Sequence, residues 1–548
     1  MKNTENFLSC QCWKNGWEFY DTLSQQELTY PLNLARNLFT SMKIFNTKQM
    51  RAWEKFTMNK EQITSIDLME NAARECSKWL EREGFVFPLC VFAGTGNNGG
   101  DGLCIARHYL EKEIPVRVYV VGNAEEGTPD FKTNLDRLLE NDVEVSFLSE
   151  ENHEIKVQPA EVLIDAIFGT GISRPADGWR AKLIDVLNRL PNTRIAIDVP
   201  SGLMPDNVER QQGAIIRAEH TLTFEVPKPA FLFAENHLFV GKFELLPIGL
   251  SNDFHTTEKS SFHYYEIFEA AEDFRPRQKF TYKNERGHLQ LLAGSKGKMG
   301  AAVLAANAAQ RAGCGLVTTH IPQCGYHIMQ QSVPEAMCET DDSENMLSSI
   351  KVNNERSALA IGPGIGTSEA TAEMLRVILK EVKIPMVLDA DALNIISQHQ
   401  LLPLLPQHTI ITPHIGEFDR LFGNHDNSFS RFETLRTKSG EHQIIIVLKG
   451  TYTTISTADQ RVSFNASGTA SLATAGSGDV LTGVIGSLLA QGYTPEIAAR
   501  LGVFLHGHAA RIINTEYGME GIIARDMIDW LLDALNDVAE VKSFSGRD

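Results

Sequence analysis

The stretch LCVFAGTGNNGGDG, residues 89–102, decides the class of fold. Its first five residues form an apolar run that suits a strand buried on both faces, and the glycines lead into a helical pattern through Ala106 and Tyr109. Glycines let the backbone approach a ligand closely, and the first turn of a helix offers free N–H groups to a phosphate. The stretch therefore predicts a parallel α/β sheet with a ligand site at this turn.

The same alternation of apolar runs and helical stretches extends through the chain and restarts after a charged segment at residues 251–286. Neither half repeats the other, so we predict two tandem αβα-layer domains, the first with a Rossmann-like parallel sheet. The predicted strands of the first half are residues 89–93, 116–121, 143–148, 162–168 and 195–199, after a helix at 65–83. Those of the second half are 289–293, 316–319, 358–361, 386–388, 409–411 and 444–448, with helices at 300–312, 368–382, 479–490 and 497–513.

Length and composition agree with two domains and limit the partners. The chain has 548 residues, of which 43% are hydrophobic, and this is enough to fill two cores. A net charge of -18 argues against nucleic acid or an anionic membrane as the main partner. We find neither a run of about 20 apolar residues nor a secretory signal, so we expect a cytoplasmic protein. The eight cysteines are scattered and predict reduced thiols; Cys10 and Cys12 lack the second pair of a metal site.

Three loops at predicted strand ends carry polar side chains in the first half: residues 94–102, 165–175 and 198–202. Ligands of parallel sheets bind outside the carboxyl ends of strands, so these loops should converge on one crevice. Each loop alone is explained by a turn and a helix cap; three together favour a site. The first loop contains Gly-x-Gly-x-x-Gly, but the next strand ends without the acid that holds a ribose, which disfavours an ordinary NAD-dependent dehydrogenase. It is not a phosphate-binding Walker loop either.

The motifs GTGNNGGDG, DAIFGTG and DVPSG resemble those of NAD(P)H-hydrate epimerases, from about residue 42 to 250. The resemblance implies a potassium ion held by Asn98, Asp165 and Ser201, and a catalytic Asp198 near the hydrated carbon of the substrate. A carboxylate there is suited to exchange protons with the C6 hydroxyl. Lys228 either assists or is an exposed structural lysine. The implied substrate-binding residues are Asn97, Asn98, Gly99, Gly100, Asp101, Gly169, Thr170, Gly171, Ile172, Ser173, Arg174, Pro175 and Asp198.

The stretch AGSGDVLTG, residues 475–483, is the most specific signal of the second half. Glycines before a helix expose N–H groups to a developing phosphate charge, and Asp479 in the first turn can take a proton from an attacking hydroxyl. Such a site performs phosphoryl transfer, although a helix cap alone would also explain Asp479. Four more motifs end predicted strands: GPGIG at 362–366, DADALN at 389–394, TPHIGE at 412–417 and LKGTYT at 448–453.

Together these motifs resemble the ribokinase-like superfamily, and within it the ADP- or ATP-dependent NAD(P)H-hydrate dehydratases, over about residues 262–541. The resemblance implies that Asp479 deprotonates the C6 hydroxyl, which takes a phosphoryl group and leaves as phosphate. His414 either binds the substrate or is a core histidine; Asp389 and Asp391 either act on Mg²⁺ through water or, for Asp391, cap a helix. The implied substrate-binding residues are Ala301, Gly364, His414 and Asp479. The implied nucleotide-binding residues are Lys449, Gly450, Thr451, Tyr452, Thr453 and Gly478.

The two resemblances imply a bifunctional repair enzyme for the hydrates of NADH and NADPH (NADHX and NADPHX). It would epimerise the R and S forms and dehydrate the S form with ADP, or else ATP, and Mg²⁺, giving AMP and phosphate from ADP. We expect an extension of unknown role at 1–41, with Met42 a candidate first residue, an epimerase domain at 42–252, a linker at 253–262, a dehydratase domain at 263–541, and a homo-oligomer. Residues 282–287 and 468–473 depart from the usual family pattern. The alternative is a ribokinase-type small-molecule kinase fused to a non-catalytic nucleotide-binding domain.

Overall fold

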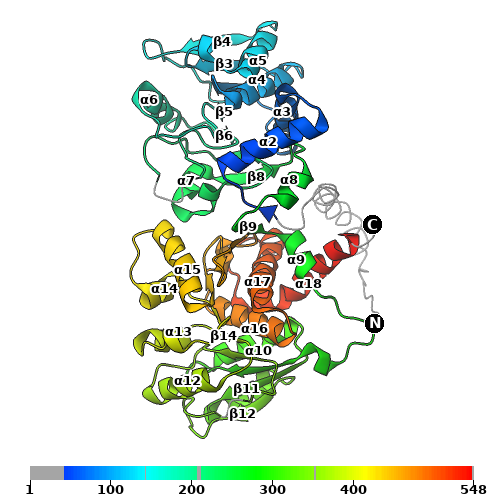
Figure 1. Cartoon of the computed structure of the whole chain (residues 1–548), viewed down its shortest axis with the longest axis vertical. Helices are drawn as coiled ribbons and strands as arrows, with labels where there is room; N and C mark the ends of the chain where they lie inside the picture. Colours follow the sequence, from blue (N-terminus) through cyan, green and yellow to red (C-terminus); the bar gives the residue numbers. More distant parts are fainter. Residues whose placement is uncertain (1–41, 142, 207–210, 351–352, 546–548) are drawn as a thin grey trace, which may run out of the picture.

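A computed structural model describes residues 42–545 apart from 142, 207–210 and 351–352 (Figure 1). Two α/β domains follow one another along the longest axis of the molecule, the first in blue to green and the second in green to red. The extension at 1–41, with Cys10 and Cys12, lies outside the described residues. Among the described helices, none is long and apolar enough to span a membrane.

The first domain is built on a parallel sheet with strand order β4-β3-β2-β5-β6-β7-β8 among the described residues. The five predicted strands are confirmed, while the last two were not predicted. From β2 the next strands along the chain, β3 and β4, lie on one side, whereas β5 and its successors lie on the other. The boundary between β2 and β5 is therefore a topological switch point, where α/β sheets form a crevice. The strands are β2 (Leu89–Gly94), β3 (Val116–Val121), β4 (Glu144–Leu148), β5 (Val162–Ala166), β6 (Arg194–Ile197), β7 (His220–Phe224) and β8 (Lys242–Leu246).

Helices cover both faces of this sheet. Buried residues of α3, α4 and α5 share one core with the sheet, and residues of α6 pack with Phe92 and Tyr119 on the opposite face. Strand β4 is less buried than β2 and β3, because it is an edge strand that leaves Glu144 and Phe147 exposed. The helices are α2 (Thr47–Glu61), α3 (Ser65–Arg82), α4 (Asn97–Leu110), α5 (Pro129–Leu139), α6 (Gly178–Leu187), α7 (His237–Val240) and α8 (Asn252–Thr257). Short 3-10 turns are η1 (Ala124–Glu126), η2 (Pro229–Leu232) and η3 (Ala234–Asn236).

The second domain has a larger sheet, with order β1-β9-β18-β17-β16-β15-β14-β13-β10-β11-β12 among the described residues. In this spatial order, the seven strands from β16 through to β12 at the edge run parallel to one another. Strand β17 pairs antiparallel with both of its neighbours, β16 and β18. The strands are β1 (Met42–Lys43), β9 (Phe262–Tyr265), β10 (His288–Leu292), β11 (Leu316–Ile321), β12 (Met337–Thr340), β13 (Ala358–Ile361), β14 (Met386–Leu388), β15 (Ile410–Ile411), β16 (Ile445–Leu448), β17 (Thr454–Ser456) and β18 (Val462–Asn465).

Two groups of helices sandwich this sheet. Helices α10, α16, α17 and α18 share a core with one face, and α12 to α15 pack against the other. The helices are α9 (Ile267–Asp273), α10 (Met299–Arg311), α11 (Tyr326–Ser332), α12 (Glu369–Glu381), α13 (Asp391–Gln398), α14 (Ile415–Phe422), α15 (Ser428–His442), α16 (Ser477–Ala490), α17 (Pro495–Tyr517) and α18 (Ala524–Ser545). The 3-10 turns are η4 (Lys283–Arg286), η5 (Gln323–Gly325), η6 (Leu402–Leu404) and η7 (Ala470–Leu472).

The boundary between the domains is more interwoven than its charged sequence suggests. Strand β1, at the start of the predicted first domain, pairs antiparallel with β9 in the second sheet. The predicted linker at 253–262 contains most of α8, where Phe254 stacks on Trp53 of α2. Across the boundary, Phe233 of the first domain packs against Phe429 of α15. The two domains therefore share an apolar contact.

Candidate active sites

A cavity of about 760 Å³ lies at the carboxyl ends of β2, β5 and β6. All three predicted loops line it, and the sheet topology brings them together, since each follows one of these strands. Gly99 and Gly100 do not line the cavity. Gly99 packs against the backbone of the preceding strand, and a Cβ there would come within 1.7 Å of the Gly94 carbonyl oxygen, so a larger residue would clash. The predicted residues that line the cavity are Asn97, Asn98, Asp101, Gly169, Thr170, Gly171, Ile172, Ser173, Arg174, Pro175 and Asp198.

Asp198 follows β6 with a φ of +61°, a left-handed conformation that is uncommon for a residue other than glycine. Its carboxylate accepts a hydrogen bond from Thr223 Oγ1 at 3.3 Å, and Lys228 Nζ lies 2.9 Å from its Oδ1. The Lys228 side chain is only 3% exposed, so the interpretation of an exposed structural lysine is wrong. A buried ammonium needs a charged partner, and Asp198 provides it.

The three predicted cation ligands lie around the backbone of Phe168. Ser201 Oγ donates to Asp165 Oδ1 at 2.5 Å, Phe168 N–H donates to Ser201 Oγ at 2.8 Å, and Asn98 Nδ2 donates to the Phe168 carbonyl at 3.1 Å. Burial raises the pKa of Asp165 to about 6, although the bonds from Ser201 oppose the shift. Carboxylate, hydroxyl and carbonyl oxygens gather here beside the Asn98 carboxamide, and hard cations prefer oxygen ligands.

Helix α2 adds Arg51 and Glu54 to the cavity wall, and we predicted neither. Burial raises the pKa of Glu54 to about 7, reinforced by the charge of Asp198 and opposed by Lys228 and Arg51. Burial and the charge of Asp198 also hold the pKa of Asp101 well above its usual range. The spacing of Arg51 and Glu54 places both on one face of a helix, but only the structure shows what that face meets.

A second cavity, of about 540 Å³, lies at the first turn of α16. Gly476 precedes the helix at a φ of +87°, and no side chain caps the helix, so its first N–H groups face the cavity. Tyr452 does not line it; this side chain stacks on Phe243 of β8 in the first domain. The predicted residues that line this cavity are His414, Lys449, Gly450, Thr451, Thr453, Gly478 and Asp479.

Ala301 and Gly364 lie together, apart from the wall of this cavity. A Cβ on Gly364 would come within 3.1 Å of the Ala301 Cβ. Beside them, Lys298 Nζ lies 3.0 Å from Asp391 Oδ2, which also accepts from Gly366 N–H at 2.9 Å. Asp391 is the first residue of α13 and not its cap, because Ala390 holds the N-cap position. The cap interpretation of Asp391 is therefore wrong.

An ion pair between a half-buried lysine and a buried carboxylate organises the second cavity. Lys449 Nζ lies 2.9 Å from Asp389 Oδ1, and Thr482 Oγ1 of α16 donates to Asp389 Oδ2 at 2.7 Å. Burial raises the pKa of Asp479 to about 6, with Asp389 adding to the shift and Lys449 opposing it. This pKa permits Asp479 to accept a proton near neutral pH.

Two histidines differ from expectation. The His414 side chain is 54% exposed and caps α14, with Nδ1 accepting from Gly416 N–H at 3.0 Å, so the core interpretation is wrong. His506 of α17 was not predicted, yet it is buried at the cavity wall with Nε2 3.2 Å from Ser477 Oγ. Burial and the charge of Lys449 lower the pKa of His506 to about 4, which keeps the ring neutral. No local motif marks His506 in the sequence.

Comparison with known proteins places one family model on each domain. Residues 289–532 match the model described as NAD(P)H-hydrate dehydratase, and residues 65–230 match the YjeF-related protein N-terminus. The bifunctional NAD(P)H-hydrate repair enzyme Nnr of Moorella thermoacetica is 33% identical, covering 91% of this chain and 98% of its own. Its counterpart in Thermofilum pendens is 29% identical, covering 91% and 97%.

A solved structure is also similar to part of this chain. The ADP/ATP-dependent NAD(P)H-hydrate dehydratase of Bacillus subtilis, co-crystallised with ATP and Mg²⁺, is 28% identical, with a TM-score of 0.46. The similarity covers 50% of this chain and 98% of the Bacillus protein.

Proposed function

This chain belongs to the family of bifunctional NAD(P)H-hydrate repair enzymes, and we propose that its two cavities divide the two reactions of that family between them. It epimerises hydrated NADH and NADPH in the first domain and dehydrates them in the second. The alternative of a small-molecule kinase fused to a non-catalytic domain is wrong, since relatives that carry both domains over nearly their full length are named as repair enzymes. The observation that supports our division is a cavity with a buried carboxylate in its wall in each domain, Asp101 in the first and Asp389 in the second.

In the first cavity, the proposed chemistry centres on Asp198. The carboxylate, held by Lys228 and Thr223, would exchange a proton with the C6 hydroxyl of the hydrate as that hydroxyl leaves and returns. Glu54 lines the same cavity and, with a pKa of about 7, is suited to supply or accept the second proton. Asn97 and the loop at 169–175 would bind the nucleotide.

The oxygen cluster beneath this cavity fits a potassium ion. Asn98, Asp165 and Ser201 would hold it, together with the Phe168 carbonyl, because all three side chains lie around the Phe168 backbone and the oxygens of Asp165 and Ser201 already meet there. The ion would supply positive charge beside the bound phosphates.

In the second cavity, Asp479 would take the proton of the C6 hydroxyl. The hydroxyl oxygen then bonds to the terminal phosphorus of ADP while the bond to the bridging oxygen breaks, and AMP leaves. Phosphate next departs from C6 as a proton leaves the adjacent carbon, which restores the ring double bond. Lys449 and the N–H groups of Gly478 and its neighbours would stabilise the negative charge on the phosphates.

Mg²⁺ bound with the nucleotide would supply further positive charge. Asp389 would contact the Mg²⁺ ion through water, because it is the carboxylate closest to Lys449 at the proposed phosphate site. Ala301, Gly364 and His414 would bind the hydrated dinucleotide. We propose ADP as the preferred phosphoryl donor, with ATP as the other candidate. We also propose the cytoplasm as the compartment, because the six described cysteines form no disulfide. We further propose a homo-oligomer, which analytical ultracentrifugation would test.

The deciding experiment uses a mixture of R and S hydrates and follows the absorbance of reduced nicotinamide. We expect complete repair with ADP by the intact chain, release of phosphate, and repair of only the S fraction by Asp198→Asn. Asp479→Ala should leave both fractions unrepaired. Accumulation of a stable phosphorylated product, or complete repair by Asp198→Asn, would contradict the proposed division.

A further inference from the structure

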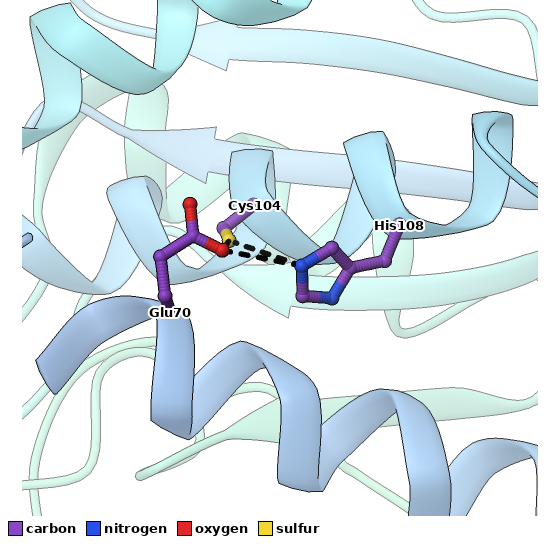
Figure 2. A group of neighbouring side chains, drawn as sticks. All are labelled: Glu70, Cys104 and His108. Carbon is purple, nitrogen blue, oxygen red and sulfur yellow. Dashed lines mark hydrogen bonds and ion pairs between the residues drawn. The ribbon is translucent and has the colours of Figure 1, made fainter. Parts of the chain in front are cut away.

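Helices α3 and α4 of the first domain bring together three metal-ligating side chains that neither cavity uses. Glu70 projects from α3, while Cys104 and His108 project from successive turns of α4 toward it (Figure 2). The thiol is buried, whereas 22% of the Glu70 side chain and 15% of the His108 side chain are exposed. The cluster is therefore rigid on its inner side and open to solvent on its outer side.

The three ligand atoms lie at separations that fit one metal ion. Cys104 Sγ lies 3.2 Å from Glu70 Oε2 and 3.7 Å from His108 Nε2, and this nitrogen lies 3.3 Å from Glu70 Oε2. In a tetrahedral zinc site the bond lengths place nitrogen and oxygen about 3.3 Å apart, and sulfur about 3.5 Å from either. Each separation in the cluster is within a few tenths of an ångström of those values.

Neighbouring side chains orient the ligands as in known metal sites. The second oxygen of Glu70, Oε1, accepts from Arg137 at 3.0 Å and from Arg107, which leaves Oε2 directed at the cluster. The other ring nitrogen of His108 lies 3.2 Å from Ser77 Oγ. Outer partners of this kind fix the ring and carboxylate orientation at metal centres.

The charges of the surroundings also suit a divalent ion. Arg107, which also contacts Glu111 at 2.7 Å, donates to the Cys104 sulfur at 3.3 Å, and a neighbouring guanidinium group favours a thiolate there. Glu70 and a Cys104 thiolate would then balance the two charges of the ion. A mixed set of one thiolate, one imidazole and one carboxylate favours zinc and similar metals over magnesium or calcium.

We propose that Glu70, Cys104 and His108 bind a zinc-class divalent ion, with water from the open side as the fourth ligand. Binding forms the metal–sulfur bond and releases the thiol proton to solvent. The ion would cross-link α3 to α4, whose N-terminal part carries Asn98 and Asp101 of the first cavity. Its role would be structural, because the cluster does not line that cavity.

The test is a titration of the metal-free full-length protein with Co²⁺, read by the charge-transfer absorption of cobalt bound to thiolate, followed by displacement with Zn²⁺. We expect one such site per chain and a higher midpoint of thermal unfolding of the first domain with Zn²⁺. Cys104→Ser should abolish the absorption band. His108→Gln, at a partly exposed position, should weaken Co²⁺ binding at least tenfold.

Two control variants assign the signal. The variant Cys10→Ser/Cys12→Ser removes the other closely spaced cysteines, and Cys324→Ser removes a partly exposed thiol of the second domain. Both should bind Co²⁺ like the unaltered chain. Absence of a thiolate band in the unaltered chain, or a band that survives in folded Cys104→Ser or at full affinity in His108→Gln, would overturn the proposal.

Discussion

The ammonium group of Lys228 lies 2.9 Å from Oδ1 of Asp198, at the wall of the first cavity. Lys228 stands in the segment after β7, whereas Asp198 directly follows β6, and pairing of these two parallel strands brings them together. The ion pair gives the buried ammonium group a carboxylate partner and orients Asp198, the residue that we propose as the epimerase acid–base group.

Removal of the lysine charge should affect both stability and activity. In Lys228→Met the Asp198 carboxylate loses its buried partner, and we expect the free energy of unfolding of the first domain to fall by up to about 3 kcal/mol. The double variant Lys228→Met/Asp198→Asn should regain part of that loss. Urea unfolding of the three proteins measures both effects, and additive losses would show that the pair does not interact.

Epimerisation should depend on the protonation of Glu54. Because the pKa of this carboxyl is raised to about 7, the rate of R/S interconversion should change with an inflection near pH 7. Glu54→Gln, which cannot titrate, should lose that inflection. Nuclear magnetic resonance of hydrate epimers across pH follows the rate. An unchanged profile in Glu54→Gln would exclude the residue from proton transfer.

The same carboxyl should make the stability of the first domain depend on pH. The folded protein holds the Glu54 proton more tightly than the unfolded chain, so this contribution is fully present below about pH 4.5 and is lost as pH rises through about 7. Denaturant midpoints of the unaltered chain and Glu54→Gln should differ in this pH window. Parallel curves would contradict the expectation.

Dehydration should increase as pH rises through about 6, because the proposed base Asp479 must be deprotonated to act. Asp479→Ala should abolish nucleotide-dependent dehydration and still bind ADP. Single-turnover absorbance measures the first effect and calorimetry the second. Turnover by the variant at more than about one hundredth of the normal rate would reject Asp479 as the base.

Lys449 should influence both nucleotide affinity and this pH profile. Loss of a charged hydrogen bond to phosphate costs about 1.5–3 kcal/mol, so Lys449→Met should bind ADP at least tenfold more weakly. Because Lys449 lowers the pKa of Asp479, the inflection of the dehydration rate should also move above pH 6. If Lys449→Met binds ADP more weakly but its dehydration rate keeps the same pH inflection, Lys449 does not influence the pKa of the proposed base Asp479.

The aromatic contact between the domains should carry much of their mutual stability. The Phe233 ring lies 4.6 Å from that of Phe429 and 5.4 Å from that of Phe432, and Phe233 is 4% exposed. Phe233→Ala should lower the free energy of unfolding by about 3–5 kcal/mol. Phe87→Ala, at a position that is 53% exposed, is the matched control and should change it by less than about 0.5 kcal/mol. Calorimetry that shows equal effects would contradict a buried interface.

The sequence by itself determined the fold class, most strands of both sheets and the strand-end loops. The reason is local: an apolar run, a glycine turn and a helix start lie within one segment, as in residues 89–102, and parallel strands present their carboxyl ends at one edge. The same local pattern predicts ligand sites around Asp198 and Asp479, and both residues line the cavities of their domains.

Only the tertiary structure decided what surrounds those carboxylates. Glu54 and His506 reach the cavities from elements that carry no recognisable motif, Lys228 proves to be buried against Asp198, and β1 joins a sheet more than two hundred residues away. Burial and ion pairing depend on contacts between distant segments, and hydrophobic periodicity describes one segment at a time. The pKa values of Glu54 and Asp479, which set the expected pH dependence of both reactions, follow from those distant contacts.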